Sequence, residues 1–232
     1  MKFAMALCLL CVPPAWAARP FVTDDARLTT AGSCQVESWV RSYEHSREAW
    51  VLPACNPGGN LEFTVGGGRA RQDAAAATSD YVLQLKTLFK PLDAEGWGWG
   101  LAVGRVLHPE IEPGPNQTGN QYAYVPVTAA FDSDRVFLHL NVGWLRDRAS
   151  RQDRATWGLG AEFYARPRLA LIAESFGDDR APPYWQAGLR YSIIPELLQV
   201  DTTVGAQHDR GRGTRWLSFG LRWTPARFWA QP

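Results

Sequence analysis

Apolar and polar residues alternate along most of the chain, and the alternation is clearest between Thr214 and Pro225. The apolar residues of this stretch share one parity and the polar residues share the other: Leu217, Phe219, Leu221 and Trp223 against Ser218, Gly220 and Arg222. Successive side chains of a strand point to opposite faces, so the stretch predicts a strand with one apolar and one polar face. A second protein layer covers such a face in a soluble protein, whereas lipid covers it in a transmembrane barrel.

The same alternation recurs upstream and predicts twelve strands in all. Their expected bounds are Ser33–Tyr43, Glu48–Cys55, Asn60–Gly66, Asp80–Lys90, Gly96–Val106, Gln121–Phe131, Arg135–Leu145, Thr156–Ala165, Leu169–Phe176, Tyr184–Ile193, Leu198–Ala206 and Thr214–Trp223. An even number of strands, many close to the roughly 9–11 residues that a tilted spanning strand needs, is typical of bacterial barrels. The pattern therefore predicts an all-β fold, an antiparallel up-and-down transmembrane β-barrel of about 12 strands.

The connections between these strands alternate in length, which favours a membrane barrel over a soluble β-sandwich. Five are brief and rich in Pro, Gly or Asp: Asn56–Gly59, Pro91–Glu95, Asp132–Asp134, Arg166–Arg168 and Pro195–Glu196. Most of the others are longer, including Gly67–Ser79, which is expected to be a flexible glycine-rich loop. Short periplasmic turns and longer outer loops are the asymmetry of outer-membrane barrels. The inner face of a sandwich also alternates and remains the alternative.

The first residues predict export. Lys2, the apolar run from Phe3 to Val12 and the A-x-A site Ala15–Ala17 form a signal peptide over residues 1–17, which implies an outer-membrane location for a barrel. Residues 18–32 lack a clear period and are expected to be a periplasmic lead-in or a plug. The barrel should then occupy residues 33–225, followed by a C-terminal tail over residues 226–232.

Charge excludes one class of partner. Removal of residues 1–17 takes away one of the 24 basic residues, so 23 basic residues remain against 23 acidic residues. A chain without a basic surplus does not point to nucleic acid as a partner. The expected partners are outer-membrane lipid, the barrel insertion machinery and a small molecule that the sequence does not identify.

Cys34 and Cys55 are the cysteines that remain after the signal peptide. A hairpin that turns near Glu44 would place them opposite each other, and an oxidising compartment favours a disulfide. Two unpaired buried thiols are the alternative. No metal site is predicted, because no His or further Cys stands at ligand spacing, and the sequence shows no cofactor motif.

The polar face of the predicted strands carries the candidate functional residues. Eleven charged or titratable side chains are expected to face the lumen: Glu37, Arg41, Glu62, Lys86, Arg135, His139, Glu162, Glu174, Arg190, Asp201 and Arg222. They could form ion pairs that only hold the lumen together, or they could select what passes through it. A catalytic interpretation around His139 is disfavoured, because no Ser flanks it and no G-x-S-x-G elbow occurs. The chain is therefore predicted not to be an enzyme, and a lipid-modifying enzyme is the least favoured alternative.

Three stretches resemble a known family of outer-membrane barrels. The segment RPFVTDDA (residues 19–26), the hairpin WVLPACNPGGNLEFTV (Trp50–Val65) and the final strand Trp216–Trp223 are similar to those of the family "MetA-pathway of phenol degradation". The final strand also fits the polar-x-Gly-x-x-aromatic pattern read by the insertion machinery, although nine residues follow it. The resemblance implies passage of small hydrophobic or aromatic compounds. A passive channel or transporter is thus the first functional hypothesis, and a non-conducting structural or partner-binding barrel is the second.

Overall fold

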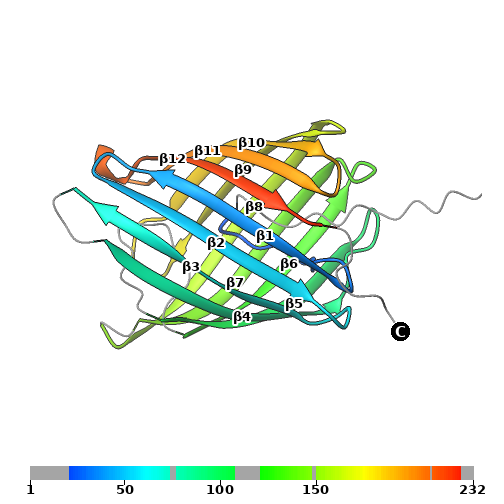
Figure 1. Cartoon of the computed structure of the whole chain (residues 1–232), viewed down its shortest axis with the longest axis horizontal. Coiled ribbons are helices and arrows are strands. Elements are labelled where there is room, and N and C mark those ends of the chain that lie inside the picture. Colours follow the sequence, from blue (N-terminus) through cyan, green and yellow to red (C-terminus); the bar gives the residue numbers. More distant parts are fainter. Residues whose placement is uncertain (1–20, 74–76, 108–120, 148–149, 210, 226–232) are drawn as a thin grey trace, which may run out of the picture.

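The computed structural model describes residues 21–73, 77–107, 121–147, 150–209 and 211–225. These residues contain twelve strands that form a closed antiparallel barrel (Figure 1). The strands are β1 (Ser33–Ser42), β2 (Ser46–Asn56), β3 (Glu62–Gln72), β4 (Thr78–Lys90), β5 (Trp97–Leu107), β6 (Gln121–Phe131), β7 (Val136–Asp147), β8 (Gln152–Arg166), β9 (Leu169–Asp178), β10 (Tyr184–Ile194), β11 (Leu198–Gln207) and β12 (Trp216–Trp223), with the short 3-10 helix η1 (Arg212–Thr214) before β12. The predicted all-β antiparallel barrel is confirmed.

Closure of the barrel depends on the first and last strands. β12 pairs with β1 in antiparallel register, from Val36 opposite Trp223 to Ser42 opposite Leu217. Every other pair joins neighbours in sequence, so the topology is up-and-down. Each described strand therefore has a partner on both sides, and its backbone N–H and C=O groups are used within the wall.

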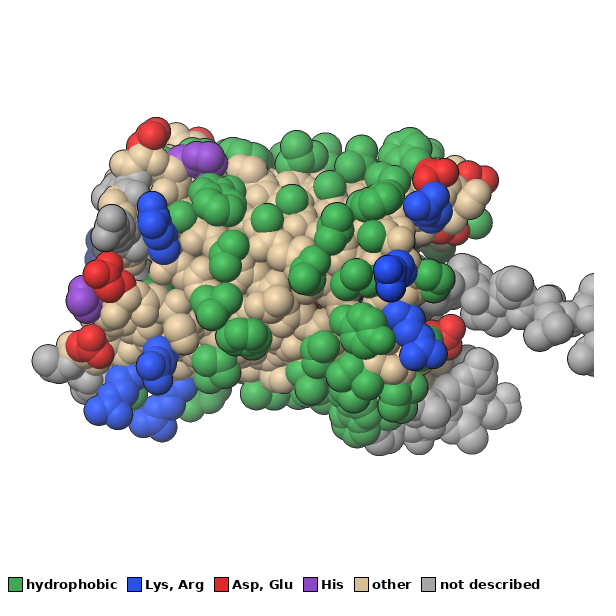
Figure 2. All heavy atoms as spheres, turned by 90° about the horizontal axis from the view of Figure 1, so that it is seen from above, with side chains coloured by type: hydrophobic (Ala, Val, Ile, Leu, Met, Phe, Trp, Pro, Cys, Tyr) green, Lys and Arg blue, Asp and Glu red, His purple; other side chains and the backbone are tan. Residues whose placement is uncertain are grey.

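The outer surface of the barrel is a broad apolar belt with charged side chains gathered at its two ends (Figure 2). Large apolar side chains face outwards on every side, and the exposed fraction of Phe219 reaches 60%. Other exposed members include Tyr81, Leu83, Phe89, Trp97, Val103, Leu138, Leu140, Val142, Leu159, Phe163, Leu189 and Tyr191. This arrangement follows the predicted parity. An apolar surface of this extent is unfavourable in water and is suited to contact with lipid.

The turns define two ends of the barrel. One end, called the short-turn end below, carries the connections at residues 57–61, 91–96, 132–135, 167–168 and 195–197. The start of β1 and the end of β12 also lie at this end, since Ser33 Oγ donates to the carbonyl oxygen of Pro225 at 2.9 Å. Among the described residues, no helix is long and apolar enough to cross a membrane, a finding that has no bearing on crossing by strands.

The glycine run Gly66–Gly68 was expected to end a strand and begin a flexible loop, and this prediction is wrong. β3 continues through the run to Gln72, with Gly67 opposite Tyr81 of β4 and Gly68 opposite Asp80. A Cβ atom on Gly68 would lie 2.3 Å from Cδ2 of the Trp50 indole. Because Gly68 has no side chain, the Trp50 ring can pack directly on the backbone of β3. Glycine at this position allows close packing and does not mark a flexible loop.

Cys34 and Cys55 form a disulfide with an S–S distance of 2.14 Å. The register of the first hairpin places them directly opposite each other on β1 and β2. The bond therefore fixes the hairpin whose first strand also closes the barrel.

Loss of this disulfide should lower stability without changing the fold. The bond closes a sequence separation of 21 residues, for which the loop-entropy model predicts about 3 kcal/mol, an upper value because the hairpin already holds the two cysteines together. Urea unfolding of the refolded barrel, followed by tryptophan fluorescence, measures the difference. The double variant Cys34→Ser, Cys55→Ser and the reduced wild type should unfold at the same urea concentration, below that of the oxidised protein. Equal midpoints for all three would show that the bond does not stabilise the barrel.

Candidate functional site in the barrel lumen

Residues 21–32 lie inside the barrel and are called the inner segment here. Five of their side chains are buried, those of Phe21, Thr23, Asp25, Ala26 and Thr29. The segment is not part of the sheet, because none of the described strands pairs with it. It starts beside wall residues of β7, β8 and β9 and reaches β1 at the short-turn end. The lumen of the described state is therefore occupied by the chain itself.

Two wall carboxylates hold the backbone of the inner segment at its two ends. Glu174 of β9 accepts hydrogen bonds from the amide groups of Val22, at 2.7 Å, and Thr23, at 2.8 Å. Glu62 of β3 accepts from the amide group of Thr29 at 2.6 Å. A buried amide without a strand partner needs another acceptor, and a carboxylate is a strong one. These two glutamates therefore replace the hydrogen bonds that a neighbouring strand would supply.

Neutral side chains hold the backbone between these points. The Thr128 hydroxyl accepts from the amide of Ala26 at 2.8 Å, and the Asn56 side-chain amide donates to the carbonyl of Thr29 at 2.7 Å. The Asn141 side chain, in the amide orientation that satisfies both atoms, accepts from the Asp24 amide and donates to its carbonyl. The segment is thus tied to the wall along its length by side chains.

A first buried charge network surrounds Asp24. Lys86 Nζ lies 2.8 Å from the Asp24 carboxylate and 3.7 Å from Asp25 Oδ1, and the Lys86 side chain is buried. The Tyr124 hydroxyl donates to Asp24 Oδ2 at 2.8 Å. Burial raises the pKa of the Asp25 carboxyl above its ordinary value, against the opposing effect of Arg27 and Lys86. Buried charges persist when they are paired in this way, so the network links the inner segment to β4 and β6.

A second buried network lies beside the start of the inner segment. Glu162 Oε2 accepts from Arg190 Nη1 at 2.8 Å and from the Tyr164 hydroxyl at 3.1 Å. His139 Nε2 lies 3.2 Å from Glu162 Oε1, and the ring of Phe21 packs on the imidazole at a centroid distance of 5.5 Å. These contacts join the inner faces of β7, β8 and β10, which lie close together in the wall. They also give the aromatic end of the segment a binding surface.

His139 is fully buried between β6 and β8. Thr128 stands opposite His139 in the β6–β7 register, and its hydroxyl lies 3.0 Å from His139 Nδ1. Together with Glu162 this makes a hydroxyl–imidazole–carboxylate chain, as a hydrolase requires. However, all three side chains are fully buried, and the hydroxyl already accepts from Ala26. A substrate has no access to it in this state, and the arrangement favours a structural role.

The structure gathers most of the predicted lumen residues on the inner face. Nine of the eleven are buried there: Arg41, Glu62, Lys86, His139, Glu162, Glu174, Arg190, Asp201 and Arg222. Glu37 is half-buried on the same face, opposite Arg222 of β12. Arg41 pairs with Glu48 at 2.8 Å, an acid that the sequence interpretation had not selected.

The prediction for Arg135 is wrong. The side chain of Arg135 is 54% exposed, lies 3.5 Å from Asp132 Oδ2 and places its guanidinium 5.7 Å from the ring centre of the outward-facing Phe163. β7 starts one residue later, at Val136, and residues 132–134 turn through positive φ angles. Arg135 therefore belongs to the rim, where strand parity no longer determines the direction of a side chain.

Sequence interpretation also missed several lumen residues. Tyr122, Tyr124 and Thr128 all lie on the inner parity of β6, a strand whose bounds were predicted correctly. Alternation alone could have found them. The contacts of Asp24 and Asp25 could not be found in this way, because residues 18–32 have no period that assigns a face.

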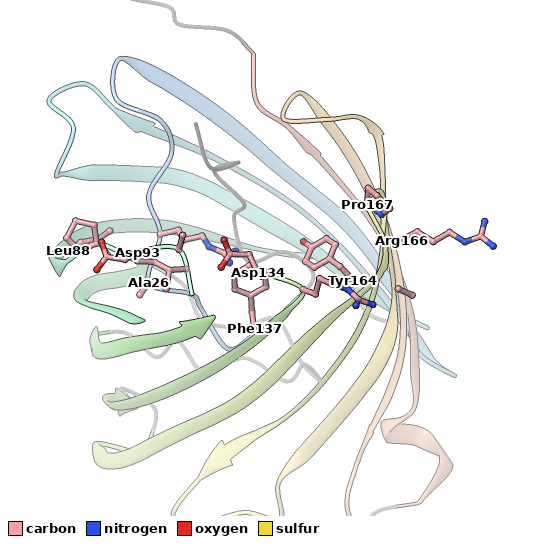
Figure 3. Close-up of a pocket in the computed structure, with 14 residues that line it drawn as sticks. Ala26, Leu88, Asp93, Asp134, Phe137, Tyr164, Arg166 and Pro167 are labelled. Carbon is pink, nitrogen blue, oxygen red and sulfur yellow. The ribbon is translucent and has the colours of Figure 1, made fainter. Parts of the chain in front are cut away.

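A cavity of about 570 Å³ opens at the short-turn end (Figure 3). Its walls come from the inner segment, through Ala26 and Arg27, and from the ends of β4, β7 and β8 with their turns. Among the described residues, no group of three or more His, Cys, Asp or Glu side chains could hold a metal ion.

These features define a fold class, a closed twelve-stranded antiparallel barrel with an apolar exterior and a charged interior. The chain belongs to the family described as Uncharacterised conserved protein UCP029691, whose family model matches residues 6–224. This match does not confirm the resemblance to the phenol-degradation family. Comparison with curated proteins finds no match.

Several solved barrels have a similar fold. The KdgM porin, solved in complex with disordered oligogalacturonate, superposes with a TM-score of 0.62 at 8% identity, covering 83% of this chain and 99% of that one. The NanC porin gives 0.58 at 10% identity, with coverage of 82% and 98%. An outer-membrane channel from Pseudomonas putida F1 gives 0.55 at 12% identity, with coverage of 87% and 98%. At these identities the likeness concerns the fold.

Proposed function

We propose that the protein is a passive outer-membrane channel for small molecules, which the inner segment closes in the described state. The observation that carries this proposal is the way the segment is held. Side chains such as Glu174 and Glu62 bind it, while the barrel wall is complete without it. Its release would break side-chain contacts and leave every strand pair intact. The wall and the closing element are therefore separable.

The outer surface supports a proposed location and direction of the channel. The apolar belt suits a lipid bilayer, and the signal peptide predicted over residues 1–17 would direct the chain out of the cytoplasm. Short turns are periplasmic in barrels of this kind, so the short-turn end would face the periplasm. The inner segment would then close the lumen from the periplasmic side.

The class of solute is part of the proposal. Similarity to the family named for the MetA pathway of phenol degradation suggests small hydrophobic or aromatic compounds. The cavity at the short-turn end supports this class, because Leu88, Leu92, Phe137 and Tyr164 contribute to its lining. A solute that enters at the short-turn end would contact apolar side chains before it reached the charged lumen.

A non-conducting structural barrel is the second candidate. The two buried charge networks favour it, since Lys86 and Arg190 are each paired within a filled lumen. A non-conducting barrel whose interior contacts only stabilise the fold would have the same structure as a closed channel. The two candidates differ in whether the inner segment can leave.

A disulfide that locks the inner segment tests this difference. The Ala26 amide lies 2.8 Å from Thr128 Oγ1, so the double variant Ala26→Cys, Thr128→Cys should cross-link the segment to β6. In planar bilayers the wild type should give intermittent conductance steps, and the oxidised variant should be silent until a reductant is added. Wild type treated with the same reductant controls for loss of the Cys34–Cys55 bond.

Two outcomes would contradict the proposal. A cross-linked variant that conducts like the wild type would show that solutes bypass the inner segment. Silence of the wild type, of the reduced variant and of a barrel without the segment would favour the structural candidate. Mass spectrometry establishes the cross-link before either conclusion is drawn.

A further inference from the structure

The cavity at the short-turn end combines an apolar chamber with one buried cation. Its volume, about 570 Å³, lies within the range that binds small organic ligands. The apolar part of the lining comes from the inner segment, the β4–β5 turn and the ends of β4, β7 and β8: Ala26, Leu88, Pro91, Leu92, Ala94, Phe137, Tyr164, Ala165 and Pro167. In Figure 3, Ala26, Phe137 and Tyr164 surround the centre of the chamber.

Arg27 is the cation that the chamber holds. Its side chain is only 9% exposed, and its guanidinium lies 4.3 Å from the ring centre of Phe137. Its Nη1 atom lies 3.4 Å from Asp25 Oδ2, and both residues belong to the inner segment. Phe137 therefore places this charge against the apolar wall, where a second anion could also reach it.

The other charged residues of the lining are Asp93, Asp134, Arg135 and Arg166, and they are directed elsewhere. Arg135 is 54% exposed and lies 3.5 Å from Asp132 Oδ2 on the rim. Asp93 pairs with Lys90 at 2.7 Å, and Asp134 Oδ1 accepts from the amide of Glu95 at 2.9 Å. Figure 3 shows the Arg166 side chain pointing away from the chamber. The two acids are thus engaged by rim partners, and the charge within the chamber is positive.

We propose that this cavity is a binding site for small amphiphilic carboxylates, with the carboxylate on Arg27 and the apolar body against Leu88, Leu92 and Phe137. A neutral solute would fill the chamber without using the cation, and an amphiphilic cation would meet a like charge. An anion that is only polar would leave the apolar wall uncovered. Charge and shape together select an acid with an apolar chain.

The site has a consequence that rests on the proposed channel function. Ala26 and Arg27 belong to the inner segment, so the complete site exists only while the segment occupies the lumen. A ligand shifts an equilibrium towards the state that it binds. The carboxylate is therefore a closing ligand, which binds at the periplasmic end and lowers the frequency of opening.

Calorimetry with octanoate tests the site independently of conduction. The mature chain in lipid nanodiscs is titrated, and the heat of empty nanodiscs is subtracted. One octanoate should bind per barrel. Arg27→Gln should weaken binding about tenfold, since it removes a charge-assisted hydrogen bond, and Arg27→Lys should retain part of the affinity. The matched control is Arg166→Gln, which removes an arginine of the same rim and should leave affinity unchanged.

Two ligands of the same chain length show whether the site recognises the negative charge of octanoate. 1-Octanol and octyltrimethylammonium should each bind about tenfold more weakly than octanoate. If 1-octanol bound as tightly as octanoate, and if Arg27→Gln bound octanoate as tightly as the wild type, the proposal would be overturned. The cavity would then be a purely apolar pocket. Equal weakening by Arg27→Gln and Arg166→Gln would also overturn it, because that result indicates general surface attraction.

Conductance then tests the closing effect by itself. Octanoate on the short-turn side should reduce opening of the wild type and have less effect on Arg27→Gln. If octanoate binds but the wild type never conducts, the channel proposal would be contradicted and the carboxylate-binding site would still be supported. Opening that increases with octanoate would overturn the closing role.

Discussion

A variant whose mature chain begins at Thr30 is expected to form a barrel with a permanently open lumen. This deletion removes the backbone amides that Glu174 and Glu62 bind and the carboxylate that Lys86 binds. Water can then enter and solvate these three charges, so the wall should still fold. Planar-bilayer recordings should show large, steady conductance steps in place of the intermittent steps of the wild type.

The fold of this variant has to be established separately. Heat-modifiable gel migration and a β-sheet circular dichroism spectrum should match those of the wild type, because no strand pair involves residues before Ser33. A barrel that passes both checks and remains silent would contradict the channel proposal. A chain that fails to fold would instead show that the inner segment is needed for assembly. The locked variant Ala26→Cys, Thr128→Cys then decides between the two candidate functions.

Replacing Glu162 by Leu should be the most destabilising single substitution of the lumen. The change leaves Arg190 and His139 without the carboxylate that pairs with them across β7, β8 and β10. Removal of one partner from a buried ion pair typically costs about 3–5 kcal/mol. Urea unfolding of the barrel in lipid vesicles, followed by tryptophan fluorescence, should show a loss of this order in the free energy of unfolding.

A double-mutant cycle separates the buried pair from the loss of packing. If the unpaired charge causes the loss, the double variant Glu162→Leu, Arg190→Leu should be more stable than Glu162→Leu alone. Glu162→Gln retains the shape and part of the hydrogen bonding and should fall between wild type and Leu. Additive effects of the two Leu substitutions would mean that Glu162 and Arg190 do not depend on each other.

The strands of the wall and the direction of their side chains could largely be predicted, because a barrel strand shows a local alternation of apolar and polar residues. In β12, the alternation of Leu217, Phe219 and Leu221 with Ser218 and Gly220 determines which side faces outwards, whatever the neighbouring strands are. The same rule placed His139 and Glu162 on the inner face. It failed where the chain leaves the strand geometry, as at Arg135 in a turn of positive φ angles. It also failed at Gly66–Gly68, where composition suggested a loop, while the Trp50 ring leaves no room for a Cβ atom at Gly68.

The sequence by itself determined the alternation and a count of about 12 strands, and it favoured a disulfide between the two cysteines, because these depend on period, length and short separations. The structure decided between that disulfide and two unpaired thiols. Only the tertiary structure decided what fills the lumen. The contacts of the inner segment join residues far apart in the chain, such as Thr23 with Glu174 at a separation of 151 residues. A local sequence pattern cannot predict such a contact. The contact forms only when the barrel has closed and its wall surrounds the inner segment.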